Sequence, residues 1–206
     1  MKQGIKGKQE VDASNRPRPP LHPPRGPRIV RGDLPLLEAV ISGGQTGVDQ
    51  AALRAVTRLG LATGGWAPKG WRTLDGPAPW LADFGLTELG REDYPARTAK
   101  CVHASDAVLR LAWDWMSLGE ICTFRAIEKY EKPHLDATPI GLLPNQPYCT
   151  IGFQSSNQES AALRVAAFLI QHRVHVLCVA GNSEQTSPGI GRVAEDFLVR
   201  TLEETR

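Results

Sequence analysis

The stretch that decides the fold is VISGGQTGVDQAAL, residues 40–53. An apolar run that ends at Ser42 predicts a buried strand over 36–42, and the glycines after it predict a tight turn. From Val48 to Leu59, apolar residues recur every three to four positions, which predicts a helix. A strand, a glycine-rich turn and a helix in this order are typical of a parallel α/β sheet.

The same alternation continues along the chain. Further strands are predicted over 61–65, 84–89, 107–113, 133–137 and 174–180, and further helices over 96–104, 119–131, 157–172 and 188–202. Repeated glycine and proline predict a long loop over 66–80. Right-handed crossovers between parallel strands place helices on both faces, so we predict an α/β, doubly wound Rossmann-like fold.

The composition indicates one globular domain behind a basic segment. The 206 residues are 41% hydrophobic and 22% charged, which excludes a wholly disordered chain, and no apolar run is long enough for a membrane span. Residues 1–33 hold eight Lys or Arg, three Asp or Glu and six of the 16 prolines, whereas residues 34–206 have a net charge of −3. We predict a flexible arm over 1–33 and a ligand-binding domain over 34–206.

Three interpretations of this arm stay open: a solvated tail, an arm for nucleic acid or an acidic partner, and a transit peptide. No aromatic side chain interleaves its charges, so nucleic-acid binding by stacking is not expected. The four cysteines are widely spaced and form no C-x-x-C pair. Without an apolar signal segment, this spacing predicts reduced thiols in a cytoplasmic protein and no metal site.

Ligands of doubly wound sheets bind outside the carboxyl ends of the strands, here in the turns after residues 42, 65, 113 and 180. The first turn matches G-x-G-x-x-G, except that Ser42 replaces the first glycine. Small residues let the backbone approach a ligand, and the N–H groups at a helix start favour an anion. The predicted binding residues of this turn are Gly43, Gly44, Gln45, Thr46 and Gly47. The alternative is a tight turn without a ligand.

Charged residues surround this turn. Asp49 in the first helix either complements the helix dipole or faces the ligand cleft. After the second strand, Lys69, Gly70 and Arg72 would add cations to an anion site, although such loop cations are often only solvated. Arg97, at a helix start, could reach the cleft or lie on the surface.

The last two turns add small and polar residues. The predicted binding residues there are Gly119, Thr123, Gly181, Asn182, Ser183, Ser187 and Gly189. The alternative is that these residues only shape their loops. Trp113 and Trp115 could stack on a flat heterocycle or pack between loops.

The strings at 40–53 and 64–79 (GGWAPKGWRTLDGPAP), followed by similar segments at 96–109, 119–133 and 179–190, resemble the molybdenum-carrier family related to YpsA, in the SLOG superfamily of Rossmann-like proteins. The resemblance implies a self-associating domain that binds a molybdopterin-type or nucleotide-like anion through the loops at 43–49, 69–72 and 181–189. Two departures stand out. Glu120 occupies a place where family members tend to have a hydroxyl, and the last loop lacks a cation that relatives carry.

The favoured hypothesis is therefore a molybdenum cofactor carrier that holds molybdopterin or a nucleotide-like ligand and has no catalytic residue. A first alternative is a phosphoribohydrolase-like enzyme that acts on a nucleotide, with Glu120 as its acid. A second is a nucleotide-sensing interaction module whose basic arm meets an acidic partner. The expected partners are a small anionic ligand and further copies of the chain, and neither a membrane nor nucleic acid is expected.

Overall fold

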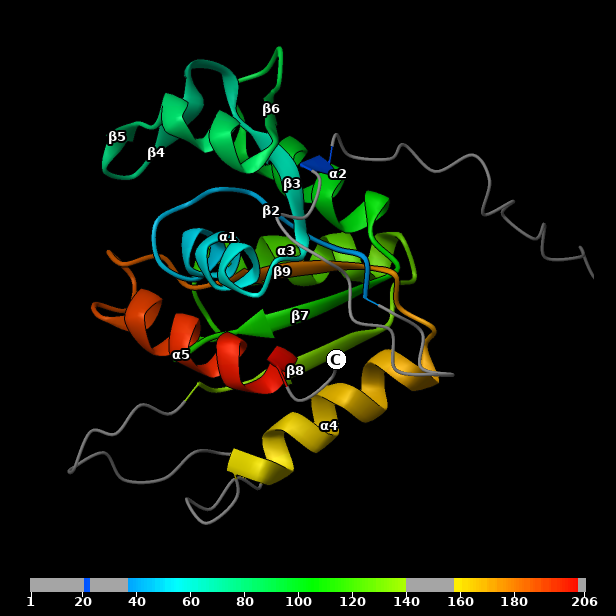
Figure 1. Ribbon diagram of the computed structural model, residues 1–206. Helices are drawn as coiled ribbons and strands as arrows, with labels where there is room; N and C mark the ends of the chain where they lie inside the picture. Colours follow the sequence, from blue (N-terminus) through cyan, green and yellow to red (C-terminus); the bar gives the residue numbers. More distant parts are fainter. Residues whose placement is uncertain (1–20, 23–36, 140–157, 204–206) are drawn as a thin grey trace, which may run out of the picture.

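The computed structural model describes residues 21–22, 37–139 and 158–203 (Figure 1). The strands are β1 (Leu21–His22), β2 (Ala39–Ser42), β3 (Ala62–Ala67), β4 (Arg72–Thr73), β5 (Gly76–Pro77), β6 (Leu86–Glu88), β7 (Ala107–Leu111), β8 (His134–Ala137) and β9 (Val176–Gly181). The helices are α1 (Val48–Arg58), η2 (Lys69–Trp71), η3 (Pro79–Phe84), α2 (Tyr94–Ala104), α3 (Leu118–Lys129), α4 (Gln158–Gln171) and α5 (Ile190–Glu203), of which η2 and η3 are 3-10 helices. Apart from β1, the predicted arm lies outside the described residues.

The main sheet has the strand order β1-β3-β2-β9-β7-β8, and β6 also pairs with β3. Six of its strands run parallel, and the two-residue β1 pairs antiparallel with β3. The structure thus confirms the predicted Rossmann-like parallel sheet. It adds β1, from the segment that the sequence assigned to the arm.

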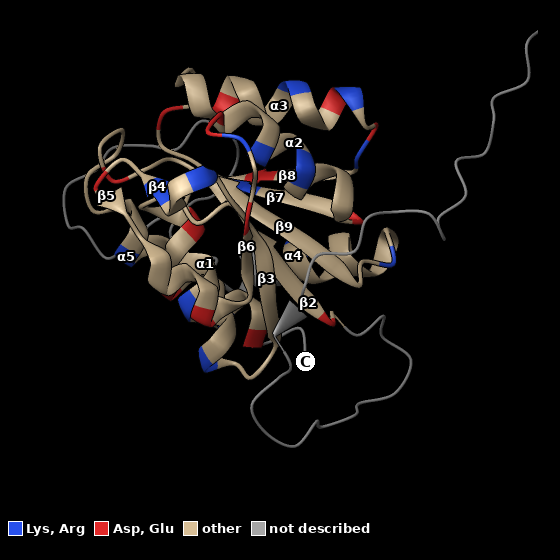
Figure 2. Cartoon of the chain, turned by 90° about the horizontal axis from the view of Figure 1, so that it is seen from above, with Lys and Arg blue, Asp and Glu red and all other residues tan. Residues whose placement is uncertain are grey.

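Each central strand contributes to two hydrophobic cores because successive side chains of a strand point to opposite faces. Val40 of β2 packs with α1, α4 and α5, whereas its neighbour Ile41 packs with α2 and α3. Leu177 and Cys178 of β9 divide between the cores in the same way. Figure 2 shows α2 and α3 along one side of the sheet and α1 and α5 along the other.

Local capping fixes where two of these helices begin. The Asp93 side chain accepts a hydrogen bond from the Ala96 N–H at 2.6 Å before α2, and Ser117 Oγ accepts one from the Glu120 N–H at 3.4 Å before α3. These caps place Arg97 and Glu120 near the starts of their helices. Both starts lie at the carboxyl edge of the sheet, where the predicted site is expected.

The loop predicted over 66–80 is wrong in part. It contains the end of β3, the short helix η2 and the β4–β5 hairpin, which stands above α1 in Figure 1. Elements of two or three residues are too short to show a hydrophobic period, so the repeated glycine and proline residues predicted a loop instead. Ala67 and Ala78 of this segment pack with Leu81 and Leu86, which follow it, and with Leu53 of α1. Among the described helices, none is long and apolar enough to cross a membrane.

Candidate functional site

The glycines of the first turn are enclosed by atoms of the same chain. A Cβ atom at Gly43 would lie 1.4 Å from Arg97 Nη1, and one at Gly44 would lie 2.8 Å from side-chain atoms of Leu81 and Leu86. Gly44 has a φ of +73° and Gly47 one of +83°, values that suit glycine. These glycines are therefore needed for the turn and for its internal packing, whatever ligand the turn holds.

Asp49 and Arg97 form a buried ion pair beside this turn. Arg97 Nη1 donates to Asp49 Oδ2 at 2.8 Å, and the Gln45 N–H donates to the same oxygen at 3.2 Å. Burial raises the pKa of Asp49, while the Arg97 charge acts to lower it. The sequence left the roles of Asp49 and Arg97 open. In the structure both side chains are buried at the carboxyl edge of the sheet, and their ion pair connects α1 to α2.

Two potential hydrogen-bond donors, one in this pair and one in the first turn, have no partner among the described residues. Thr46 Oγ1 and Arg97 Nε are buried and have no hydrogen-bond partner within the part of the chain that the structure describes. A buried donor without a partner costs about 1–3 kcal/mol. An acceptor from outside the chain would remove that cost, which makes these two atoms the best candidates for ligand contacts.

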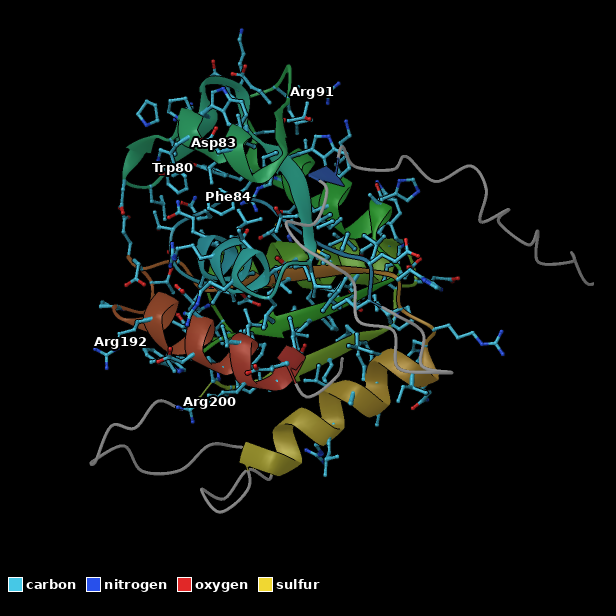
Figure 3. The ribbon with its side chains drawn as sticks, in the orientation of Figure 1. Trp80, Asp83, Phe84, Arg91, Arg192 and Arg200 are labelled. Atoms are coloured by element: carbon cyan, nitrogen blue, oxygen red, sulfur yellow. The ribbon has the colours of Figure 1, made fainter. Side chains whose placement is uncertain are left out.

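The cations after β3 lie on an exposed segment. Lys69 and Arg72 are exposed, Arg72 Nη1 pairs with Glu92 Oε2 at 3.0 Å, and the Gly70 N–H donates to Glu88 Oε1. The Lys69 N–H donates to the carbonyl of Arg91, which lies at the top of this segment in Figure 3. The predicted contacts of Lys69, Gly70 and Arg72 with a ligand stay predictions.

The tip of the same segment reaches the first turn through its backbone. The Leu74 N–H donates to Gln45 Oε1 at 2.8 Å, and Gln185 Nε2 donates to the Leu74 carbonyl at 2.9 Å. Trp80 and Phe84 of η3, labelled in Figure 3, are in edge-to-face contact, and Phe84 packs against the hydrophobic cluster around Leu53. The hairpin therefore joins the first loop to the last one.

The start of α3 brings a second group of charges to the edge. Arg110 of β7 binds Asp136 through two hydrogen bonds, and its Nη1 lies 3.5 Å from Glu120 Oε2. The Arg110 guanidinium also lies 5.1 Å from the Trp115 ring and 5.0 Å from the Phe124 ring. The sequence left open whether Trp115 stacks on a heterocycle or packs between loops, and in this structure its ring contacts Arg110.

Glu120 is the buried acid of this group. Its side chain is 1% exposed, and its pKa is raised to about 7, chiefly by burial. Gly119, just before it, has open space around its Cβ position, and Thr123 Oγ1 donates to the Gly119 carbonyl at 3.0 Å. Thr123 lies beyond the first turn of α3, and its hydroxyl is already bonded.

The loop after β9 is closed by its own side chains. Asn182 Oδ1 accepts from the Trp113 and Asp114 N–H groups and from Ser187 Oγ, at 2.8–2.9 Å. Gly181 is pressed against the Leu111 carbonyl, which a Cβ atom would approach to 2.0 Å. Asn182 and Ser187 thus tie loops together, and their predicted contacts with a ligand stay predictions.

An acidic side chain occupies the start of α5. Glu184 accepts from the Gly189 and Gly191 N–H groups, each at 2.7 Å. Ser183 Oγ accepts from the Thr186 N–H at 3.2 Å. These N–H groups near the helix start therefore already bind the chain's own carboxylate.

Sequence reasoning did not assign Arg110, Asp136 or Glu184 to the site. Arg110 interrupts the otherwise apolar run AVLRLAW, and a charged residue inside a buried strand is a usable signal because it requires a partner. Asp136 and Glu184 carry no comparable signal. Their partners depend on which loops meet at the edge.

Comparison with known proteins identifies the family and supports the fold. Residues 40–202 match the circularly permutated YpsA SLOG family. The chain belongs to this family. Its structure is similar to the crystal structure of a protein described as "Putative molybdenum carrier protein" from Syntrophus aciditrophicus SB, with a TM-score of 0.69 and 30% identity over 82% of this chain and 98% of the other. A search of curated proteins gave no match. The predicted family is thereby confirmed.

Proposed function

We propose that this SLOG-family chain is a carrier that binds a small anion, of the molybdopterin or nucleotide type, beside the first turn. The observation that carries the proposal is the pair of buried donors without partners, Thr46 Oγ1 and Arg97 Nε. Phosphate and molybdate oxygens are acceptors, so they fit these donors. The name of the similar protein from Syntrophus aciditrophicus supports a molybdenum-containing ligand.

In this proposal the residues of the chain bind and orient the anion. Thr46 donates from the turn and Arg97 Nε donates from α2, while the Asp49 carboxylate holds the guanidinium in place. A bound molybdenum cofactor would supply its phosphate and metal-bound oxygens as acceptors. We propose further that the protein associates with copies of itself, as the resemblance to carriers implies, and that it is cytoplasmic, as its widely spaced cysteines indicate.

Equilibrium dialysis of the full chain against molybdopterin, molybdate, AMP and NAD tests the proposal. Thr46→Val keeps the shape of the side chain and removes its hydroxyl, so we expect it to weaken binding about tenfold or more. Thr57→Val is the matched control, because Thr57 Oγ1 is bonded to the Leu53 carbonyl within α1. The proposal is wrong if none of the four compounds binds at high micromolar concentration.

The same samples separate a carrier from a hydrolase. A carrier returns AMP unchanged after incubation, whereas a phosphoribohydrolase-like enzyme releases free adenine. Glu120 is the buried acid that such an enzyme would use, because a pKa near 7 suits an acid–base group. Adenine release that is lost in Glu120→Gln would replace the carrier proposal with the hydrolase.

A further inference from the structure

Glu120 has no part in the proposed contacts, yet it is buried beside them. It lies in the first turn of α3, its side chain is 1% exposed, and its Oε2 makes no hydrogen bond to any described residue. An ionised carboxylate in the interior is normally paired and fully hydrogen-bonded. The position of Glu120 therefore favours the neutral acid.

The ionisable groups around Glu120 come from five parts of the fold. Arg110 of β7, Asp136 of β8, Asp114 of the loop after β7 and Asp49 of α1 all act on it electrostatically. Arg97 of α2 stands beyond Asp49 as its ion-pair partner. His134 of β8 makes an edge-to-face contact with Phe124 of α3.

Both arginines of this cluster are already engaged by other carboxylates. Arg97 is bonded to Asp49, and Arg110 is bonded through two atoms to Asp136. What remains for Glu120 is a 3.5 Å approach to Arg110 Nη1 that is not a hydrogen bond. Within this group of residues, two cations thus face four carboxylates, so two of the carboxylates, Asp114 and Glu120, are not neutralised by these arginines.

An anion bound at Thr46 and Arg97 would add another negative charge near Asp49 and Glu120. The bound anion and an ionised Glu120 would repel each other across a poorly solvated space, unless Glu120 is neutralised. We propose that ligand binding is proton-linked and that Glu120, when it is ionised in the free protein, takes up one proton from solvent as the anion binds. This inference rests on the proposed function, and it names Glu120 as the residue that sets the affinity according to pH.

The direction of the pH dependence follows from the charge state of Glu120. Because its pKa is about 7, the Glu120 carboxyl of the free protein is mainly neutral below pH 7 and mainly ionised above it. Binding should therefore be insensitive to pH below about 7 and should weaken above it, by up to about tenfold per pH unit. Glu120→Gln, which is neutral at every pH, should bind equally well on both sides of pH 7.

Carbon NMR of the full chain with labelled glutamate tests the first step without any ligand. The expected result is a Glu120 carboxyl signal that titrates near pH 7, assigned by its loss in Glu120→Gln. Titration in the ordinary range of glutamate, near about 4.3, would overturn the inference and leave the proposed function intact.

Dialysis against molybdate at pH 6 and pH 8 tests the second step, because this anion keeps its charge over that range. We expect weaker binding at pH 8 in the unchanged chain and in Glu128→Gln, an exposed acid on the same helix, but equal binding in Glu120→Gln. Equal binding by the unchanged chain at both pH values would overturn the inference alone. Absence of molybdate binding at both values would overturn it and remove the molybdate form of the proposed function.

Discussion

Asn182 is the residue that holds the loops after β7 and β9 together. Its Oδ1 accepts from the N–H groups of Trp113 and Asp114, and its Nδ2 donates to the Asp114 carbonyl at 2.9 Å. With Ser187 and Ser117 as further partners, all the polar atoms of this side chain are engaged within the chain. Asn182 thus acts on the site by fixing the loops around it.

Replacing Asn182 should therefore lower stability. Asn182→Ala leaves the partly buried N–H groups of Trp113 and Asp114 and the buried Ser187 hydroxyl without this acceptor. We expect a loss of about 2 kcal/mol in the free energy of unfolding, measured with urea. Gln171→Ala removes an exposed amide at the end of α4 and should change stability by about 0.5 kcal/mol or less. Equal effects of the two variants would show that the Asn182 contacts contribute little.

Replacing Gly43 with alanine tests the contribution of the buried Asp49–Arg97 ion pair to stability. In Gly43→Ala the new methyl group would occupy the place of the Arg97 guanidinium, which must then leave Asp49. Breaking a buried pair costs about 3–5 kcal/mol, so we expect a large loss in urea-induced unfolding experiments. Gly119→Ala is the control: its Cβ position is open, and alanine in a helix should be neutral or stabilising. A Gly43→Ala protein as stable as Gly119→Ala would contradict the assigned role of Arg97.

At the scale of elements, the Glu184 carboxylate binds backbone N–H groups near the start of helix α5. Glu184→Ala removes the acceptor for the Gly189 and Gly191 N–H groups and should cost about 1 kcal/mol of unfolding free energy. Hydrogen exchange at these two amides should become faster. Asp196→Ala, which changes an exposed acid later in the same helix, should leave both amides protected. Unchanged exchange in Glu184→Ala would mean that other groups cap the helix.

The elements also show what the sequence could predict. β2, β7 and β9 lie in largely apolar runs, and the sequence located each of them because buried parallel strands have this pattern. The β4–β5 hairpin was missed, since two-residue strands have no detectable period.

The sequence predicted where the candidate site lies, but it did not predict which side chains contact one another there. The carboxyl ends of the strands were located because parallel strands end at one edge. The Asp49–Arg97 pair joins residues 48 positions apart, and Glu184 reaches back onto its own helix start. Such partners depend on how α1, α2 and the last loop pack, which local patterns do not encode.

At the scale of the whole molecule, net charge does not favour anion binding. Residues 34–206 have a net charge of −3, so a bound anion must depend on the local field of Arg97 and the turn. Screening is strong beyond about 10 Å at 0.1 M salt. We expect molybdate binding to weaken severalfold between low and high sodium chloride in dialysis. Affinity that stays constant over that range would argue against an electrostatic site.

The most direct test of the central claim, an anion site beside the first turn, is an amide NMR titration of the full chain with molybdate and with AMP. The account predicts the largest shift changes at residues 43–49 and at Arg97 and Thr98, with smaller changes at Gly119 and Glu120. Shift changes centred on another face, or none with either compound, would contradict it.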